Sequence, residues 1–166
     1  MSTLRMSFVN LLVPDGSGNV YWQPAAVLDT NDLWPTDQVL IFTDGATKVS
    51  SSCHIPVPKN YVGTAKIGLR WKTTLTSNDV VWDVDYRSVA VGESADQATF
   101  QESLTVTDTA AGTANWLNDA EVTLTSANLA VDDSIYINIS RDGTDGADTM
   151  AGSAQLVDAW FEYVDS

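Results

Sequence analysis

The chain has few of the residues that form disulfides or bind transition metals. Its 166 residues include one cysteine, Cys53, and one histidine, His54. A single cysteine excludes a disulfide within the chain, so no oxidised framework stabilises the fold. Adjacent residues of a strand point to opposite faces, so this pair cannot converge on one metal ion or act as a thiol beside its base. We interpret the pair as structural.

Positive charge is also scarce. The chain has 8 Lys and Arg residues against 22 Asp and Glu residues, which gives a net charge of −14 and a pI near 4.1. Binding to nucleic acid requires a surplus of Lys and Arg on one face, and anionic membranes attract the same residues. The composition therefore argues against direct contact with nucleic acid or with a membrane.

Long apolar runs are missing as well. The opening Met-Ser-Thr-Leu-Arg leads directly into a strand-like segment, without an apolar stretch or a small-residue cleavage site. A secretory signal needs both of these features, and a membrane-spanning helix needs about 20 apolar residues. We therefore expect synthesis in the cytoplasm, with neither a signal nor a membrane span.

No motif for catalysis or for a cofactor is present. With one histidine the chain offers no nucleophile triad. The carboxylate pairs at 83/85 and 132/133 lie on a polar strand face and in a turn, where no apolar pocket would prepare a general acid. Residues 141–148 contain three aspartates and are the best calcium candidate, but Asp-Gly pairs are also common turn chemistry. We expect no enzyme activity, cofactor or metal, and leave calcium open for this loop.

Residues 61–91 alternate apolar and polar side chains at period two, pass one turn and alternate again. Such alternation is typical of antiparallel strands with one buried face, and it places Trp71 and Trp82 in the core. We predict that the two halves form an antiparallel hairpin, in which the register that pairs opposite charges is favoured by roughly 0.2 to 1 kcal/mol for each pair. This register predicts that Arg70 faces Asp85 and that Lys72 faces Asp83.

Further strand-like segments recur to the end of the chain, separated by turn residues. Together with one strand over 4–13, we predict strands over 38–43, 98–107, 120–125, 134–141 and 154–164, and no convincing helix. The pattern predicts an all-β fold: a single antiparallel two-sheet sandwich over residues 1–166, jelly-roll-like, with about eight strands. Residues 1–37 are predicted to be an irregular N-terminal segment that takes part in assembly.

Six tryptophans are many for this length, and some of them are candidates for an interface. Trp22 and Trp34 lie in segments bordered by proline, which central strands exclude. In the last strand the alternation places Leu156 and Trp160 on the outward face, where an exposed Trp can anchor an interface or stack on a sugar. The alternative for Trp160 is that another part of the chain covers it. We predict these four residues as interface candidates.

Several segments carry a family resemblance: 33–35 (Leu-Trp-Pro), 39–44 (Val-Leu-Ile-Phe-Thr-Asp), 55–58 (Ile-Pro-Val-Pro), 61–63 (Tyr-Val-Gly), 65–71, 80–84, 139–148 and 161–163 (Phe-Glu-Tyr). Together they resemble small β-sandwich proteins among the structural proteins of tailed bacteriophages. The resemblance covers the chain from about residue 33 to the C-terminus, and it implies a jelly roll that assembles as a homotrimer on virions, in capsid decoration (cement) proteins or in fibres. No catalytic residues come with it.

Two hypotheses follow from these features. The first is a virion structural protein that binds the outside of a phage capsid, with the major capsid protein as its partner, and stabilises the shell by mass action. The alternative is a carbohydrate-binding or receptor-binding domain of a phage fibre that uses Trp160 or Trp22 as a stacking platform. The first predicts a broad base against the capsid, and the second predicts an aromatic cleft.

Overall fold

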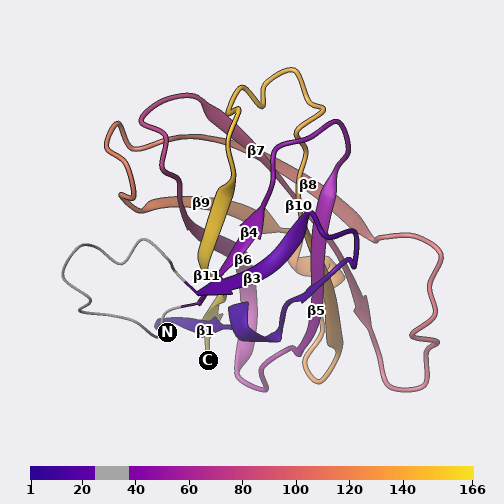
Figure 1. Cartoon of the computed structure of the whole chain (residues 1–166). Coiled ribbons are helices and arrows are strands. Elements are labelled where there is room, and N and C mark those ends of the chain that lie inside the picture. Colours follow the sequence, from indigo (N-terminus) through magenta and orange to yellow (C-terminus); the bar gives the residue numbers. More distant parts are fainter. Residues whose placement is uncertain (25–37) are drawn as a thin grey trace.

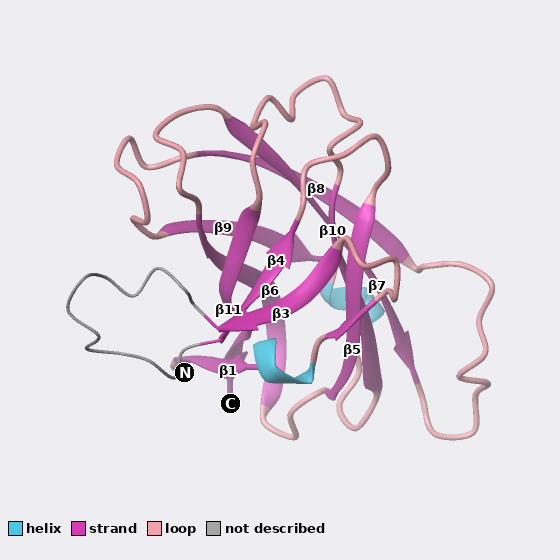
Figure 2. Cartoon of the chain, viewed as in Figure 1, coloured by secondary structure: helices cyan, strands magenta, loops and turns pink. Residues whose placement is uncertain are grey.

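The structure, a computed structural model, describes residues 1–24 and 38–166. This part of the chain forms eleven strands in two antiparallel sheets that pack face to face, which confirms the predicted jelly-roll-like sandwich (Figures 1 and 2). Two short 3-10 helices are also present, η1 (Val9–Leu11) and η2 (Ser126–Asn128). In the described ranges no helix has the length and apolar character needed to cross a membrane.

One sheet has six strands. Its central strand, β11, pairs with β4 and β1 along one edge and with β6 along the other. The order is β3 (Val20–Pro24), β4 (Gln38–Phe42), β11 (Ala154–Asp165), β6 (Tyr61–Lys72) and β9 (Asn118–Leu124), with β1 (Thr3–Ser7) as a second partner of β11.

The other sheet has five strands, and its central strand is β10. The order is β2 (Val13–Pro14), β5 (Val49–Pro56), β10 (Ser134–Arg141), β7 (Asp79–Val89) and β8 (Glu102–Thr109). The sequence pattern did not predict β3 or β5, and the predicted strand over residues 4–13 is divided into β1, η1 and β2.

The predicted hairpin over residues 61–91 is wrong in its pairing and right in its burial. Both halves are strands, but β6 lies in the six-stranded sheet and β7 in the five-stranded sheet. Their apolar faces meet across the core, where the rings of Trp71 and Trp82 are 6.2 Å apart. Neither Arg70 nor Lys72 lies across a ladder from Asp83 or Asp85. The physical reason is that alternation determines which face is buried and leaves the neighbouring strand open.

Two of the three basic residues of β6, Arg70 and Lys66, pair with acidic residues of the strand beside it. Arg70 lies opposite Asp119 of β9 and donates two hydrogen bonds to its carboxylate, at 2.7 and 2.6 Å. Lys66 donates a hydrogen bond at 2.9 Å to Glu121, which also belongs to β9. The bidentate contact lowers the pKa of the Asp119 carboxyl, chiefly through the hydrogen bonds from Arg70.

Residues 1–24 belong to the sandwich and do not form the predicted irregular arm. Phe8, Leu12 and Val20 are buried in the main core. Ser2 donates from its backbone to Asp165 at 2.5 Å, so the two ends of the chain lie together (Figure 1). Deletion of this segment would remove core side chains and two strands of the six-stranded sheet. Residues 25–37 of the predicted irregular segment lie outside the described residues.

The strand pairing predicts an energetic coupling between Arg70 and Asp119. Both side chains are partly exposed, so a double-mutant cycle with Arg70→Gln and Asp119→Asn should give a coupling of about 0.3 to 1 kcal/mol by urea denaturation. The matched cycle of Arg70→Gln with Asp85→Asn should give about zero, within the usual error of additivity. Coupling with Asp85 and none with Asp119 would favour the hairpin instead.

Candidate functional site

The outer face of the five-stranded sheet carries polar and aromatic side chains in register. Tyr136 of β10 lies between His54 of β5 and Arg87 of β7. Two residues along, Asn138 lies between Ser52 and Asp85. The next row continues with Ser50, Ser140 and Asp83. Since side chains at i and i+2 of a strand share a face, these three rows form one surface.

A groove of about 910 Å³ lies on this surface. Leu11 and Val13 border one side, and Phe100 from the loop between β7 and β8 borders the other. That loop extends from the body of the sandwich (Figure 1). The floor of the groove belongs to β5 and β10. It contains Ser50, Ser52, Cys53, His54, Tyr136, Ile137 and Asn138.

The groove contains exposed aromatic groups. The rings of His54 and Tyr136 stack at 5.4 Å with an interplanar angle of 27°. Tyr136 is 37% exposed and Phe100 is 52% exposed. Exposed rings of this kind offer flat apolar surfaces, and the hydroxyl, amide and imidazole groups around them offer hydrogen bonds. Such a surface can bind a ligand with an apolar face and a polar edge.

The carboxylates at the end of the surface are paired with a cation. Lys48 contacts Asp83 at 2.8 Å and Asp85 at 3.8 Å, and Thr105 donates to Asp83. Desolvation lowers the pKa of Lys48, but the hydrogen bond that Lys48 donates to Asp83 and the charge of Asp85 outweigh it and raise that pKa overall. The ammonium group therefore stays charged and balances the two carboxylates. The predicted cation partners, Arg70 and Lys72, are replaced here by one lysine.

The described groups around the groove include one thiol and one imidazole. Burial raises the pKa of the Cys53 thiol to about 12, so it carries almost no thiolate near neutral pH. His54 is exposed and stacks on Tyr136. Among the residues that the structure describes, no group of three or more His, Cys, Asp or Glu side chains could hold a metal ion.

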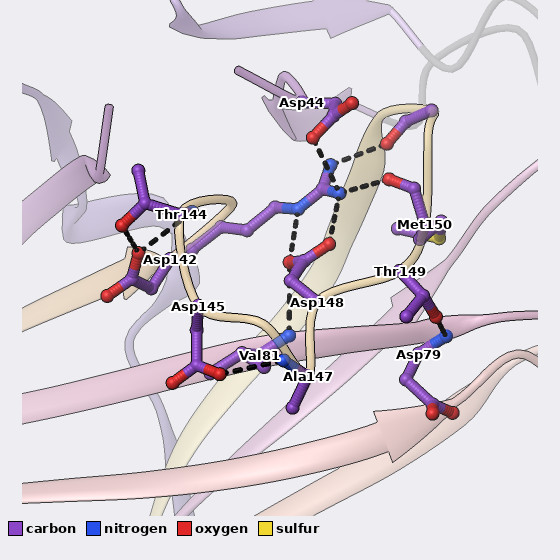
Figure 3. Close-up of polar contacts among 12 residues, drawn as sticks. Asp44, Asp79, Val81, Asp142, Thr144, Asp145, Ala147, Asp148, Thr149 and Met150 are labelled. Carbon is purple, nitrogen blue, oxygen red and sulfur yellow. Dashed lines mark hydrogen bonds and ion pairs between the residues drawn. The ribbon is translucent and has the colours of Figure 1, made fainter. Parts of the chain in front are cut away.

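The Asp-rich loop after β10 is organised around a buried arginine (Figure 3). Arg141 donates to both carboxylate oxygens of Asp148 at 2.9 and 2.8 Å, and to the backbone carbonyls of Met150 and Gly152. The backbone N–H of Val81 also donates to Asp148. Both oxygens of the Asp148 carboxylate thus accept hydrogen bonds from groups of the protein itself.

The other two aspartates of this loop bond to the loop itself. Asp142 accepts hydrogen bonds from the backbone and hydroxyl groups of Thr144, and Asp145 accepts one from the backbone of Ala147 (Figure 3). These contacts are the turn chemistry that the Asp-Gly pairs predicted. The three carboxylates thus have separate protein partners, and they do not form one group that could hold a metal ion.

Loss of the arginine should destabilise the fold strongly. The side chains of Arg141 and Asp148 are 0% and 1% exposed, so Arg141→Met leaves a carboxylate buried without its counter-ion. We expect the free energy of unfolding, measured with urea, to fall by about 3 to 5 kcal/mol. The double variant Arg141→Met with Asp148→Leu should recover part of this loss. A loss below about 1 kcal/mol in the single variant would contradict the proposed pairing.

Leu156, one of the four interface candidates, does not face outward. It is fully buried in the main core, because a β-bulge between Leu156 and Asp158 shifts the register by one residue. The bulge places both Leu156 and Ala159 on the core side, although they are three residues apart. Simple alternation cannot anticipate such a shift.

Trp160 lies on the face opposite the core but is only 3% exposed. Its ring lies over Gly68 of the neighbouring strand, where an added Cβ atom would be 2.2 Å from the ring. The guanidinium groups of Arg5 and Arg70 lie 4.6 and 5.5 Å from the ring centroid. These contacts cover the tryptophan, as in the alternative considered for it, so no open stacking platform exists at this residue.

Trp22 lies in strand β3 rather than in a loop. It is partly buried against the main core, and its indole N–H donates to the carbonyl of Leu12 at 3.3 Å. Trp34 lies outside the described residues. The role of these residues in subunit contacts stays a prediction.

The packing of Trp160 on Gly68 can be tested directly. Gly68→Ala places a methyl group 2.2 Å from carbon atoms of the Trp160 ring, which is a steric clash. We therefore expect a loss of about 1 to 3 kcal/mol in the free energy of unfolding, measured with urea. Gly45→Ala is the matched control, because an added Cβ there meets nothing within 4 Å. It should stay within about 0.5 kcal/mol of the parent. Equal effects of the two changes would contradict this packing.

The sequence predictions missed the residues that form the groove. They considered only tryptophans as exposed aromatics, and they did not recognise β5, which supplies His54 and Ser52. A usable signal was present in residues 134–141, where Ile135, Ile137 and Ile139 alternate with Tyr136 and Asn138. Buried isoleucines on one face place the tyrosine and the asparagine outside.

Comparisons with known structures support the fold. An isomalto-dextranase of Arthrobacter globiformis T6 matches with a TM-score of 0.61 and 15% identity over 96% of this chain, which spans 23% of the enzyme. A family 35 carbohydrate-binding module of Paenibacillus barcinonensis matches with a TM-score of 0.56 and 10% identity over 95% of this chain and 97% of the module. A family 35 module of Clostridium thermocellum gives 0.50 and 10%, over 97% and 98%.

No protein-family model matches the chain, and no curated protein sequence matches it. At identities of 10 to 15% the structural matches show a shared β-sandwich fold. Two of these structures are modules of nearly the same extent as this chain, and the third is a much larger enzyme.

Proposed function

We propose that this protein is a carbohydrate-binding domain whose site is the groove on the outer face of the five-stranded sheet. The observation that carries the proposal is the exposed aromatic group of Tyr136 stacked on His54, with Phe100 at the border of the groove and Asn138 and Ser52 beside it. This is the alternative that the sequence left open, with the stacking residues moved from Trp160 and Trp22 to the opposite sheet.

The chemistry of the groove matches that of a sugar ring. A pyranose has an apolar face of C–H groups, which can stack on an aromatic ring, and an edge of hydroxyl groups, which needs donors and acceptors. The volume of about 910 Å³ lies within the range of about 300 to 1,000 Å³ typical of small-ligand sites. The chain shares its β-sandwich fold with carbohydrate-binding modules, and this likeness supports the proposal by analogy only.

Binding without catalysis is the simplest use of these residues. Asp83 and Asp85 both contact Lys48, so their environments do not separate one as a general acid from the other as a base. Capsid decoration, the homotrimer, the major capsid protein as a partner and localisation in the virion stay predictions, since the described contacts and the comparisons do not bear on them.

The proposal predicts that an aromatic ring in the groove dominates the affinity. A glycan array should identify ligands, and titration calorimetry should then show that Tyr136→Ala weakens binding by about tenfold or more, equal to about 1.4 kcal/mol. Phe100→Ala should act in the same direction. Tyr21→Ala is the matched control, because Tyr21 is 41% exposed on β3 of the other sheet, and it should leave the affinity unchanged.

Thermal unfolding of each variant separates loss of binding from loss of fold, since Tyr136 is partly exposed and its truncation leaves the core intact. A parent protein that retains no glycan on the array would overturn the proposal. So would equal losses of affinity in Tyr136→Ala and Tyr21→Ala.

A further inference from the structure

A second hollow adjoins the groove. It has a volume of about 200 Å³ and lies between β7, β10 and the loop that carries Phe100. Tyr136 and Phe100 line both hollows, so a ligand stacked on Tyr136 borders each of them. The remaining lining residues are Arg87, Val89, Ala95, Gln97, Ala98 and Thr99.

Arg87 is the charged group of this hollow. One nitrogen of its guanidinium, Nη1, donates to the carbonyl of Thr99 at 2.9 Å, which fixes the side chain against the loop. Within residues 1–24 and 38–166, no carboxylate lies within 4 Å of this guanidinium. Five of the eight cationic side chains form such ion pairs: Arg5, Lys48, Lys66, Arg70 and Arg141.

Three carboxylates that are close to Arg87 in sequence or in strand pairing have other partners. Asp85, on the same face of β7, contacts Lys48. Glu102, across the ladder from Tyr86, accepts hydrogen bonds from that tyrosine and from Thr125. Asp133 accepts one from Ser88. A guanidinium without an anion therefore faces a hollow in a protein of net charge −14.

We propose that this hollow is a subsite for an anionic substituent of the bound glycan, a carboxylate or a sulfate group. The inference rests on the proposed function. Tyr136 and Arg87 are directly opposed on one face, where Cβ atoms are about 4.5 to 5.5 Å apart. A substituent of a ring stacked on Tyr136 can thus reach the free N–H groups of Arg87, whose fork matches the oxygens of either anion.

The test uses pairs of oligosaccharides that differ only in the anion. One arm compares a uronic-acid oligosaccharide with its carboxyl-reduced form, and the other compares a sulfated oligosaccharide with its desulfated form. We expect the full chain to bind the acidic member of at least one pair about tenfold more tightly, with a preference that weakens as salt rises. The arm that shows this preference identifies the anion.

Variants then assign the preference to the arginine. Arg87→Gln should remove the preference while leaving the affinity for the neutral member within about twofold, and Arg87→Lys should restore it in part, since a lysine keeps the charge without the fork. Lys59→Gln is the matched control, because it removes one positive charge from an exposed position outside the two hollows. It should keep the full preference.

Three results would overturn the inference. The first is equal binding of both members in both pairs, or a preference for the neutral members. The second is an equal loss of acidic and neutral binding in Arg87→Gln, which would assign a structural role to the arginine. The third is a lost preference in Lys59→Gln. Failure of the proposed function differs from all three, since it removes binding of every oligosaccharide.

Discussion

The contact between Trp71 and Trp82 across the core is the constraint on which the rest of the structure depends. It joins the two sheets through strands that are consecutive in the sequence, and Phe42 packs edge-on against Trp82 at 5.1 Å. Both indole rings are fully buried. Because the chain crosses from one sheet to the other between β6 and β7, β7 takes a position beside β10, with its outer face toward solvent.

The site follows from that placement. Once the inner positions of β7 and β10 are filled by apolar side chains, the residues between them must lie on the outer face. Arg87, Asp85 and Asp83 then line up with the outward residues of β10. Two carboxylates close together on this face are tolerated because Lys48 balances them, and removal of that lysine would leave charges of little exposure without a partner.

The sequence predicted the fold class and the buried faces of residues 61–91, because burial at period two is a local property of each strand. It did not predict the neighbours of these strands. Several aspartates and glutamates can match Arg70, and the correct one, Asp119, lies far along the chain. Leu156 was misplaced because one bulge reverses the alternation, and β5 was missed because its polar outer face and two prolines nearby obscure the pattern.

The candidate site was less predictable than the fold, because it depends on three strands and a loop that meet only after folding. Tyr136 and Asn138 could be placed outside from the isoleucines between them, but the stacking on His54 requires the register of β5 against β10. The role of Arg141 was equally hidden. A buried guanidinium that binds Asp148 and two carbonyls depends on the path of a whole loop.

The net charge of −14 does not conflict with an anionic ligand at Arg87. Exposed charges farther than a Debye length, about 8 Å at physiological ionic strength, are largely screened, so most carboxylates of the surface contribute little at the hollow. Contact with the guanidinium acts over hydrogen-bond distance, where screening is weak. The acidic surface would slow the approach of a polyanion. The affinity for a short acidic oligosaccharide would instead be determined by the groups that contact it.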